Sequence, residues 1–365
     1  MATDQNKPGW WIFGNDGAAG DRLERLPAAP PWRRFDEEAR AGRGKRFIPR
    51  AEEIDLVNAA LYLRRPLLIT GKPGVGKTSL TYAVAEDLEL GEVLRWSITT
   101  STTLRDGLYR YDAIARLQDA SLEQTSRGAA AAAAAAGGRK SNAAQANAGQ
   151  AAAPPIGRYL RLGPLGTAFA ASREGRPRVL LIDEIDKSDI DLPNNLLHIF
   201  EEGEFTIPEL ERLPEEEVSI LPADAPVEAT LKTHGIRVKR GRVRCEAFPF
   251  VVMTSNAERE FPPAFLRRCL KLDMAVPSSD ALRDIVKIHL FGPESLDRDV
   301  LDKALETRLD DLIGDFLKRR DAASQDLAAD QLLNAVYMVL RDADPEKRYG
   351  DRTALMEALW RPLSE

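Results

Sequence analysis

Residues 66–80 read PLLITGKPGVGKTSL and combine a short apolar run with a glycine-rich loop. Pro66 to Thr70 form a short apolar run of the kind found in buried parallel strands. Gly71 to Thr78 match the pattern G-x-x-x-x-G-K-[ST], which joins a strand to a helix around an anion. Its glycines let backbone N–H groups turn inward, and the following helix adds its positive end. The stretch therefore predicts a phosphate-binding strand–loop–helix unit.

The side chains of this loop indicate how a polyphosphate would be held. Lys77 supplies a mobile cation for the outer phosphates, and Thr78 supplies a hydroxyl for Mg²⁺. A chance glycine-rich turn is disfavoured because a strand pattern precedes the loop and a helix pattern follows it. The predicted binding set is the loop and the residue after it: Gly71, Lys72, Pro73, Gly74, Val75, Gly76, Lys77, Thr78 and Ser79.

Two further apolar runs end in polar residues. Val179–Ile182 is followed by Asp183 and Glu184, and the run 251–255 by Asn256. Ligands of open α/β sheets bind at the carboxyl ends of the strands. We expect Asp183 to hold Mg²⁺ through water, and Glu184 to orient and polarise the attacking water. Asn256 would hydrogen-bond that water or the γ-phosphate, and the alternative is that it caps the next turn.

Strands separated by helices predict an α/β fold: a P-loop NTPase αβα sandwich with a parallel sheet, followed by a small all-α lid domain. Beyond Pro277 only helix patterns remain. We divide the chain into an irregular Trp/Pro-rich arm (1–45), the core (46–276) and the lid (277–365). The arm is either docked through its tryptophans, on the core or on a neighbouring subunit, or a partly ordered tail.

Two inserts interrupt the core. Residues 126–155 contain eight consecutive alanines and then Gly, Ser, Asn and Gln, without an apolar face to bury, so we expect disorder rather than an exposed helix. The insert 204–248 contains a predicted β-hairpin around Lys239-Arg240-Gly241. Its basic residues could contact nucleic acid or an acidic partner, although a solvated charged edge is the favoured interpretation: Lys232, Arg237, Lys239, Arg240, Arg242 and Arg244.

Composition excludes several classes of protein. With 51 Lys and Arg against 57 Asp and Glu in 365 residues, the net charge of −6 argues against a nucleic-acid coat. Two cysteines exclude a disulfide scaffold and a Cys-based zinc site, and they fit a reducing, cytoplasmic location. Three separated histidines offer no metal-ligand spacing. The first twenty residues lack the basic start and apolar stretch of a secretory signal, so none is expected. The sequence contains no apolar run of about 18 residues or more, so no transmembrane helix is predicted.

The order of these motifs resembles an AAA+ ATPase, and its details are similar to the MoxR-like, dynein-related branch. In that family the acidic strand is the Walker B motif, and Gly157–Ala171 resembles the stretch leading into it. Pro262–Arg268 is similar to a family segment that carries a trans-acting arginine, which aligns best with Arg268 and less well with Arg267. The resemblance implies ATP hydrolysis between subunits of a ring, commonly a hexamer, with Glu184, Asn256, Arg268 and Lys77 as catalytic residues.

The same family usually carries a basic residue at the start of a lid helix. The stretch 328–334 resembles that helix but lacks one, which leaves Arg352 as the candidate for contacting the nucleotide. ATP rather than GTP is implied by the resemblance, with Phe47 and Ile48 placed to touch a base. The leading hypothesis is a Mg²⁺-dependent, chaperone-like remodelling ATPase acting on an unknown client protein. The alternatives are a McrB-like nucleic-acid motor and a slow nucleotide switch in a defence or signalling assembly, and a P-loop kinase is disfavoured.

Overall fold

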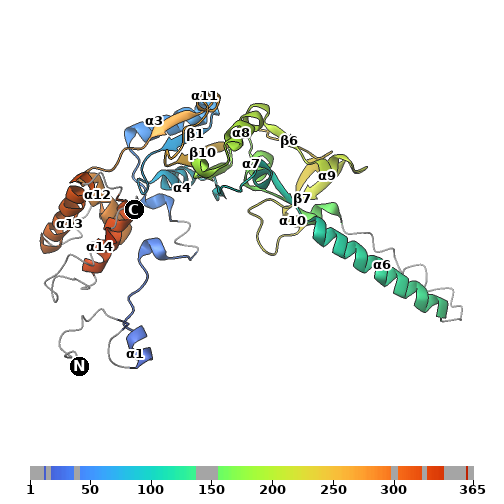
Figure 1. Ribbon diagram of the computed structural model, residues 1–365, viewed down its shortest axis with the longest axis horizontal. Helices are drawn as coiled ribbons and strands as arrows, with labels where there is room; N and C mark the ends of the chain where they lie inside the picture. Colours follow the sequence, from blue (N-terminus) through green and yellow to red (C-terminus); the bar gives the residue numbers. More distant parts are fainter. Residues whose placement is uncertain are drawn as a thin grey trace.

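A computed structural model describes residues 12–13, 18–36, 42–136, 155–296, 303–322, 327–340 and 359–360 of the chain. Its centre is a five-stranded parallel sheet with the strand order β11-β1-β10-β5-β2 (Figure 1). Every neighbouring pair is parallel, as the alternation of strands and helices predicts. The strands are β1 (Leu67–Thr70), β2 (Leu94–Ser97), β5 (Val179–Asp183), β10 (Phe250–Ser255) and β11 (Leu270–Asp273).

Helices cover both faces of this sheet, which explains its unbroken apolar strands. Every residue of β1, β5 and β10 is buried, because each strand face packs on a helix layer. One layer is formed by α3 (Ala51–Leu63) and α4 (Lys77–Asp87), and the other by α7 (Pro164–Ala171) and α8 (Asp191–Glu202). The predicted αβα sandwich is confirmed.

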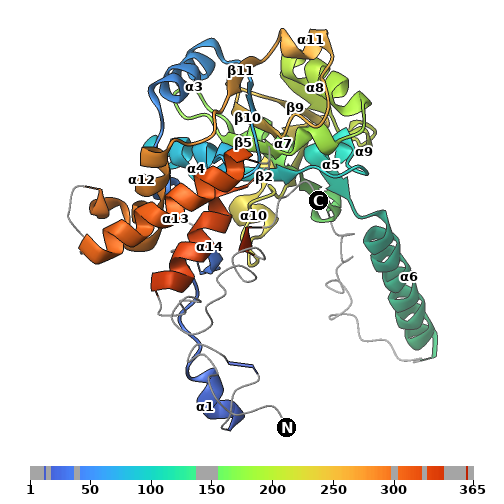
Figure 2. The same ribbon diagram turned by 60° about the vertical axis from the view of Figure 1, so that its left-hand side comes forward.

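The C-terminal part is helical, as predicted. α12 (Ser279–Phe291), α13 (Lys303–Ala322) and α14 (Ala329–Leu340) pack around a separate apolar core beside the sheet domain (Figure 2). Near the C-terminus, the ring of Trp360 packs edge-on against Phe316 with 5.9 Å between the ring centroids, a usual spacing for an aromatic pair. In the residues described, no helix is long and apolar enough to cross a membrane.

The N-terminal arm crosses the lid. It contains the short helix α1 (Ala19–Leu23), which buries no residue. Trp32 donates from its indole nitrogen to Asn334 Oδ1 at 3.1 Å, and its ring meets Tyr337 edge-on at 5.8 Å. Tyr337 in turn donates its hydroxyl to the carbonyl of Ala28 at 2.6 Å. Trp32 therefore contacts the lid of its own chain, rather than the core or a neighbouring subunit as predicted. Trp10 and Trp11 lie outside the described residues.

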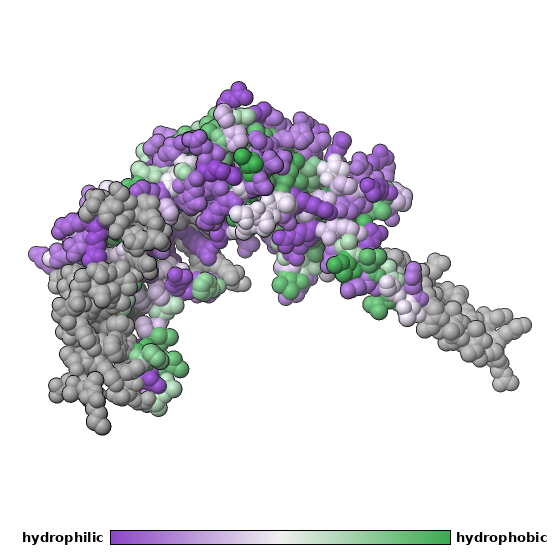
Figure 3. Space-filling view, viewed as in Figure 1, coloured by the Kyte–Doolittle hydropathy of each residue, from purple (hydrophilic) through white to green (hydrophobic). Residues whose placement is uncertain are grey.

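The first insert differs from its prediction. α5 (Leu104–Leu108) is followed by the antiparallel pair β3 (Tyr109–Tyr111) and β4 (Leu160–Leu162), between which α6 (Ala113–Ala136) extends away from the body (Figure 1). We expected disorder from Ser126, but α6 continues through the alanine run because alanine has the highest helix propensity. Residues 137–154 lie outside the described part. Apolar side chains gather where α6 leaves the body, on a face that is otherwise largely hydrophilic (Figure 3).

The second insert is a four-stranded antiparallel sheet, here called the insert sheet, with the order β6-β9-β8-β7. The predicted hairpin is present, with positive φ at Arg240 and Gly241 as a two-residue turn requires. Its inner side chains join the main core, so it is more than an isolated hairpin. The strands are β6 (Glu204–Thr206), β7 (Glu217–Ile220), β8 (Ile236–Lys239) and β9 (Arg242–Arg244), and short helices α9 (Pro208–Glu211), α10 (Leu231–His234) and α11 (Pro263–Leu266) complete the domain.

Candidate nucleotide-binding site

The predicted phosphate loop joins the carboxyl end of β1 to the first turn of α4. Gly74 has φ of 76° and Gly76 has φ of 101°, which only glycine adopts readily. Space also demands glycine: a Cβ on Gly74 would lie 2.5 Å from Ala328 Cβ, and one on Gly76 2.9 Å from the Phe47 ring. The loop is therefore packed between Ala328 of the lid on one side and the ring of Phe47 on the other.

Lys77 lies in the middle of the loop with its ammonium group fully engaged. Nζ donates to the carbonyl oxygens of Gly71 at 2.6 Å and Lys72 at 2.9 Å, and to Asn256 Oδ1 at 2.8 Å. Burial lowers its pKa, against the opposing effect of the nearby carboxylates, of which Asp186 acts most strongly. Two residues predicted from separate motifs, Lys77 and Asn256, thus meet directly.

Asp183 ends β5 opposite the loop and is held by three groups. Its Oδ1 accepts from Thr78 Oγ1 at 3.1 Å and from Thr254 Oγ1 at 2.7 Å, and its Oδ2 is 2.6 Å from Arg95 Nη2. Mg²⁺ takes hard oxygen ligands at about 2.1 Å in octahedral geometry, so neighbouring ligands or their waters lie about 3 Å apart. The Thr78–Asp183 pair fits that requirement. No cluster of three or more His, Cys, Asp or Glu suited to a metal occurs in the described residues, so the remaining ligands would come from phosphate and water.

Glu184 follows Asp183 in a conformation that is uncommon for a residue with a Cβ. Its φ of 62° and ψ of 49° place it in the left-handed region, a strain that collects at functional sites. Its N–H donates to Thr254 Oγ1 at 2.9 Å, and its carboxylate pairs with Lys187 Nζ at 2.9 Å. That hydrogen bond raises the pKa of Lys187. Thr254 therefore orients both acids of the motif, a role that the sequence analysis missed.

Asp186 is a second residue that the sequence analysis missed. Its Oδ2 accepts from the backbone N–H groups of Asn256 at 2.8 Å and Glu258 at 3.3 Å, which fixes the turn carrying the Asn256 amide. Its other oxygen, Oδ1, is buried without a hydrogen-bond partner in the described structure. The third acid in the sequence Asp183-Glu184-Ile185-Asp186 was the available signal.

One cleft of about 800 Å³ lies between the sheet domain and the lid, and its lining includes Lys77, Thr78, Arg95, Asp183, Glu184, Thr254 and Asn256. Phe47 and Ile48 also line it, as expected of residues near a base. The lid contributes side chains of α12 and α14, none of them Lys or Arg among the residues described: Ala281, Asp284, Ile285, His289, Ala329, Asp330 and Leu333. Arg352 lies outside the described residues.

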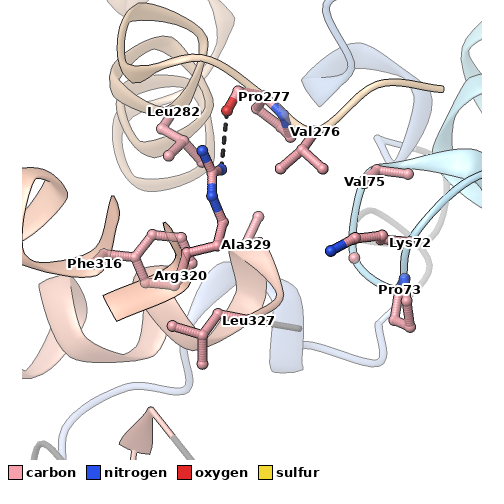
Figure 4. Close-up of a pocket in the computed structure, with 11 residues that line it drawn as sticks. Lys72, Pro73, Val75, Val276, Pro277, Leu282, Phe316, Arg320, Leu327 and Ala329 are labelled. Atoms are coloured by element: carbon pink, nitrogen blue, oxygen red, sulfur yellow. Dashed lines mark hydrogen bonds between the residues drawn. The ribbon is translucent and has the colours of Figure 1, made fainter. Parts of the chain in front are cut away.

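The lid touches the phosphate loop directly beside this cleft. Figure 4 shows Lys72, Pro73 and Val75 facing Leu327 and Ala329 of the lid across a small pocket. In the same view Arg320 reaches back from α13 and donates to the carbonyl of Pro277 at 3.1 Å, in the segment that connects the two domains. A movement of the lid would therefore reach the loop without any intervening element.

The candidate trans arginines lie elsewhere. Arg268 follows α11 near the start of β11, is 37% exposed, and pairs with Glu201. It also donates to the carbonyl of Ala264 at 3.2 Å. Arg267 is exposed, and its carbonyl accepts a hydrogen bond from Arg65. Neither arginine lines the cleft of its own chain.

A glycine-rich loop with Lys77 and Thr78, facing an acidic strand across a parallel sheet, defines a P-loop nucleotide-binding domain. Comparison with known families refines this class: residues 46–210, less than half of the chain, match a family model described as AAA ATPase domain. Residues 46–210 are therefore similar to an AAA ATPase domain, and the geometry of the site is that of a P-loop nucleotide-binding domain.

Two solved structures are similar at low identity. A proposed ATPase from Cytophaga hutchinsonii ATCC 33406 is 13% identical over 78% of this chain and 71% of its own, with a TM-score of 0.32. A RuvB point mutant from Thermotoga maritima is 12% identical over 79% of this chain and 68% of its own, with a TM-score of 0.35. No curated protein matches the chain. The fold assignment rests on the strand order of this chain itself.

Proposed function

We propose that the chain binds MgATP in the cleft and hydrolyses it. The observation that carries this proposal is the meeting of Lys77, Thr78, Asp183 and Asn256 at one edge of the sheet, from three separate sequence motifs. Bound Mg²⁺ would neutralise phosphate charge, held through Thr78 and Asp183. A structural polar network accounts less well for an 800 Å³ cleft that opens onto these groups.

Each residue has a definite task in this proposal. Lys77 exchanges its carbonyl partners for the outer phosphate oxygens, which are better acceptors because they are charged. Glu184 orients and polarises the attacking water once its carboxylate leaves Lys187. Asn256, fixed through its backbone by Asp186, presents its amide to the γ-phosphate or the water. ATP is preferred to GTP in this proposal, with Phe47 and Ile48 at the base.

The finer part of the proposal concerns assembly and work. Arg268 is partly exposed at a domain edge and outside its own cleft, as an arginine that completes a neighbouring subunit's site must be. We therefore propose a ring, a hexamer of MoxR type in the cytoplasm, that couples lid movement to the remodelling of a client protein in a chaperone-like manner. The close approach of Gly74 to Ala328, which leaves no room for a Cβ, would link movement of the lid to the loop.

The nucleic-acid alternative finds little support in the insert sheet. Arg240 lies 2.7 Å from Glu216, and Arg237 and Arg242 lie 3.8 and 3.9 Å from Glu217 and Glu204. The neighbouring glutamates neutralise the positive charge of these arginines, which contacts with phosphate would need. A protein client is therefore the favoured substrate.

The decisive experiment compares Glu184→Gln with wild type. We expect the variant to bind a fluorescent ATP analogue normally while its ATP turnover falls by about 100-fold. Glu202→Gln, an exposed acid at the end of α8, is the matched control and should hydrolyse normally. Wild-type turnover in Glu184→Gln would contradict the assigned base. The same variant, held in its ATP state, serves as bait for the client.

A further inference from the structure

Arg95 is a charged residue of the nucleotide site that no sequence motif marks. It lies on the edge strand β2, whose Leu94 and Trp96 are buried while Arg95 and Ser97 are exposed. In the parallel register Arg95 is beside Leu181 and Ser97 is beside Asp183. Paired residues share a sheet face, so Arg95 extends along the face that carries Asp183. It also lines the 800 Å³ cleft.

Arg95 and Asp183 form a close ion pair in which the arginine is half-exposed and the aspartate is buried. Nη2 lies 2.6 Å from Oδ2, and the side chains are 48% exposed for Arg95 and 8% for Asp183. Thr78 and Thr254 both bind the other oxygen, Oδ1, and among the described residues Arg95 is the cation in direct contact with this nearly buried carboxylate. A buried carboxylate without a cation is costly, which explains why the arginine is held there.

Mg²⁺ and the Arg95 guanidinium need the same carboxylate. Resting on the proposed nucleotide function, we propose that Arg95 is a positioning residue that holds the place of Mg²⁺ on Asp183 and must be displaced, or share the carboxylate, when the metal loads with nucleotide. A cation that is already bound makes loading harder and keeps Asp183 oriented until then. Because Arg95 is half-exposed, it can swing into the cleft without disturbing the core.

The test measures binding of a fluorescent ADP analogue as a function of Mg²⁺ concentration, with EDTA as the metal-free reference. Arg95→Gln removes the charge, and we expect its half-saturating Mg²⁺ concentration to fall by about tenfold, the effect of one hydrogen bond to a charged group. A merely structural ion pair would give no change, or a higher Mg²⁺ requirement, and either result overturns the inference. Folding is checked by circular dichroism.

Matched variants keep this inference separable from the proposed function. Arg178→Gln removes a similar ion pair, 2.7 Å from Asp224 and away from the cleft, and should leave the Mg²⁺ dependence unchanged. Should Arg95→Gln not fold, Arg95→Lys, which keeps the charge but loses the planar fork, is expected to lower the Mg²⁺ requirement by a smaller factor, and an unchanged or raised requirement overturns the inference. Failure of wild type to bind the analogue at any Mg²⁺ concentration overturns the proposed function itself.

Discussion

The nucleotide cleft and the outer face of the insert sheet use the same charged residue types in opposite surroundings. In the cleft, Lys77 and Asp183 are buried, and each makes three polar contacts. On the insert sheet, Arg237, Arg240 and Arg242 are 75%, 77% and 66% exposed, each with one glutamate nearby. Only the first arrangement pays a desolvation cost.

This difference in burial separates functional charge from solubilising charge. Removing one partner of a buried pair costs about 3–5 kcal/mol, whereas an exposed pair contributes about 0–1 kcal/mol. Buried charges that are held by several polar partners and face a cleft are therefore candidates for chemistry. Exposed pairs on a sheet edge need no explanation beyond protection against strand-to-strand aggregation.

Arg268 does not follow this division between buried functional charge and exposed charge. Its side chain is 37% exposed and paired with Glu201, like a residue of the insert sheet, yet the proposed ring makes it essential. We expect Arg268→Ala to lower ATP turnover by about 100-fold or more, because a trans arginine stabilises transition-state charge. Steady-state hydrolysis and analogue binding should show lost turnover with retained affinity.

Mixing experiments decide whether Arg268 acts on a neighbour. A mixture of Arg268→Ala and Lys77→Ala subunits should hydrolyse ATP faster than either alone, because one subunit supplies an intact cleft and the other an intact arginine. Arg267→Ala, the adjacent exposed arginine, is the matched control and should lose less activity. If no mixing ratio exceeds the sum of the two variants, the trans role is wrong.

Thr254 is a buried residue that contacts both acids of the nucleotide site. Its hydroxyl donates to Asp183 and accepts from the Glu184 N–H, and the residue is 1% exposed. We expect Thr254→Val, which keeps the shape, to cost about 1–3 kcal/mol of stability because two buried groups lose a partner. ATP turnover should fall by about tenfold as both acids lose orientation. Chemical denaturation and hydrolysis assays measure the two effects.

The control for Thr254 is Thr206→Val on β6, where the same change is made at an exposed position. It should alter stability by less than about 0.5 kcal/mol. Equal stability loss in both variants, with full turnover in Thr254→Val, would show that the hydroxyl does not position the acids.

The sequence predicts those parts of the fold that depend on local pattern. The apolar runs at β1, β5 and β10, the loop 71–78 and the turn at Arg240-Gly241 each carry their signal within a few residues. The meeting of Lys77 with Asn256 was predictable in kind, because carboxyl ends of parallel strands share an edge.

The parts that the sequence does not predict depend on contacts between distant segments. β3 pairs with β4 across the whole first insert, and three-residue strands carry little pattern of their own. Arg95 lies in an edge strand with an ordinary alternating pattern, and only the register of β2 with β5 brings it close to Asp183. Thr254 looks like any strand threonine until its neighbour in space is known. The extent of α6 depends on propensity alone, which is a weak guide.

The smallest expected effect belongs to the insert sheet. Replacing Arg237, Lys239, Arg240 and Arg242 together by glutamine removes the exposed charges without creating new repulsion against the facing glutamates. We expect ATP turnover to stay within about twofold of wild type, since exposed pairs contribute little.

Duplex DNA binding is measured in parallel over a range of salt concentrations. Wild-type affinity that falls steeply with salt, and is lost in the variant, would instead make the nucleic-acid motor the better function, because that slope counts phosphate contacts. Weak binding that is equal in both proteins would count against the nucleic-acid motor.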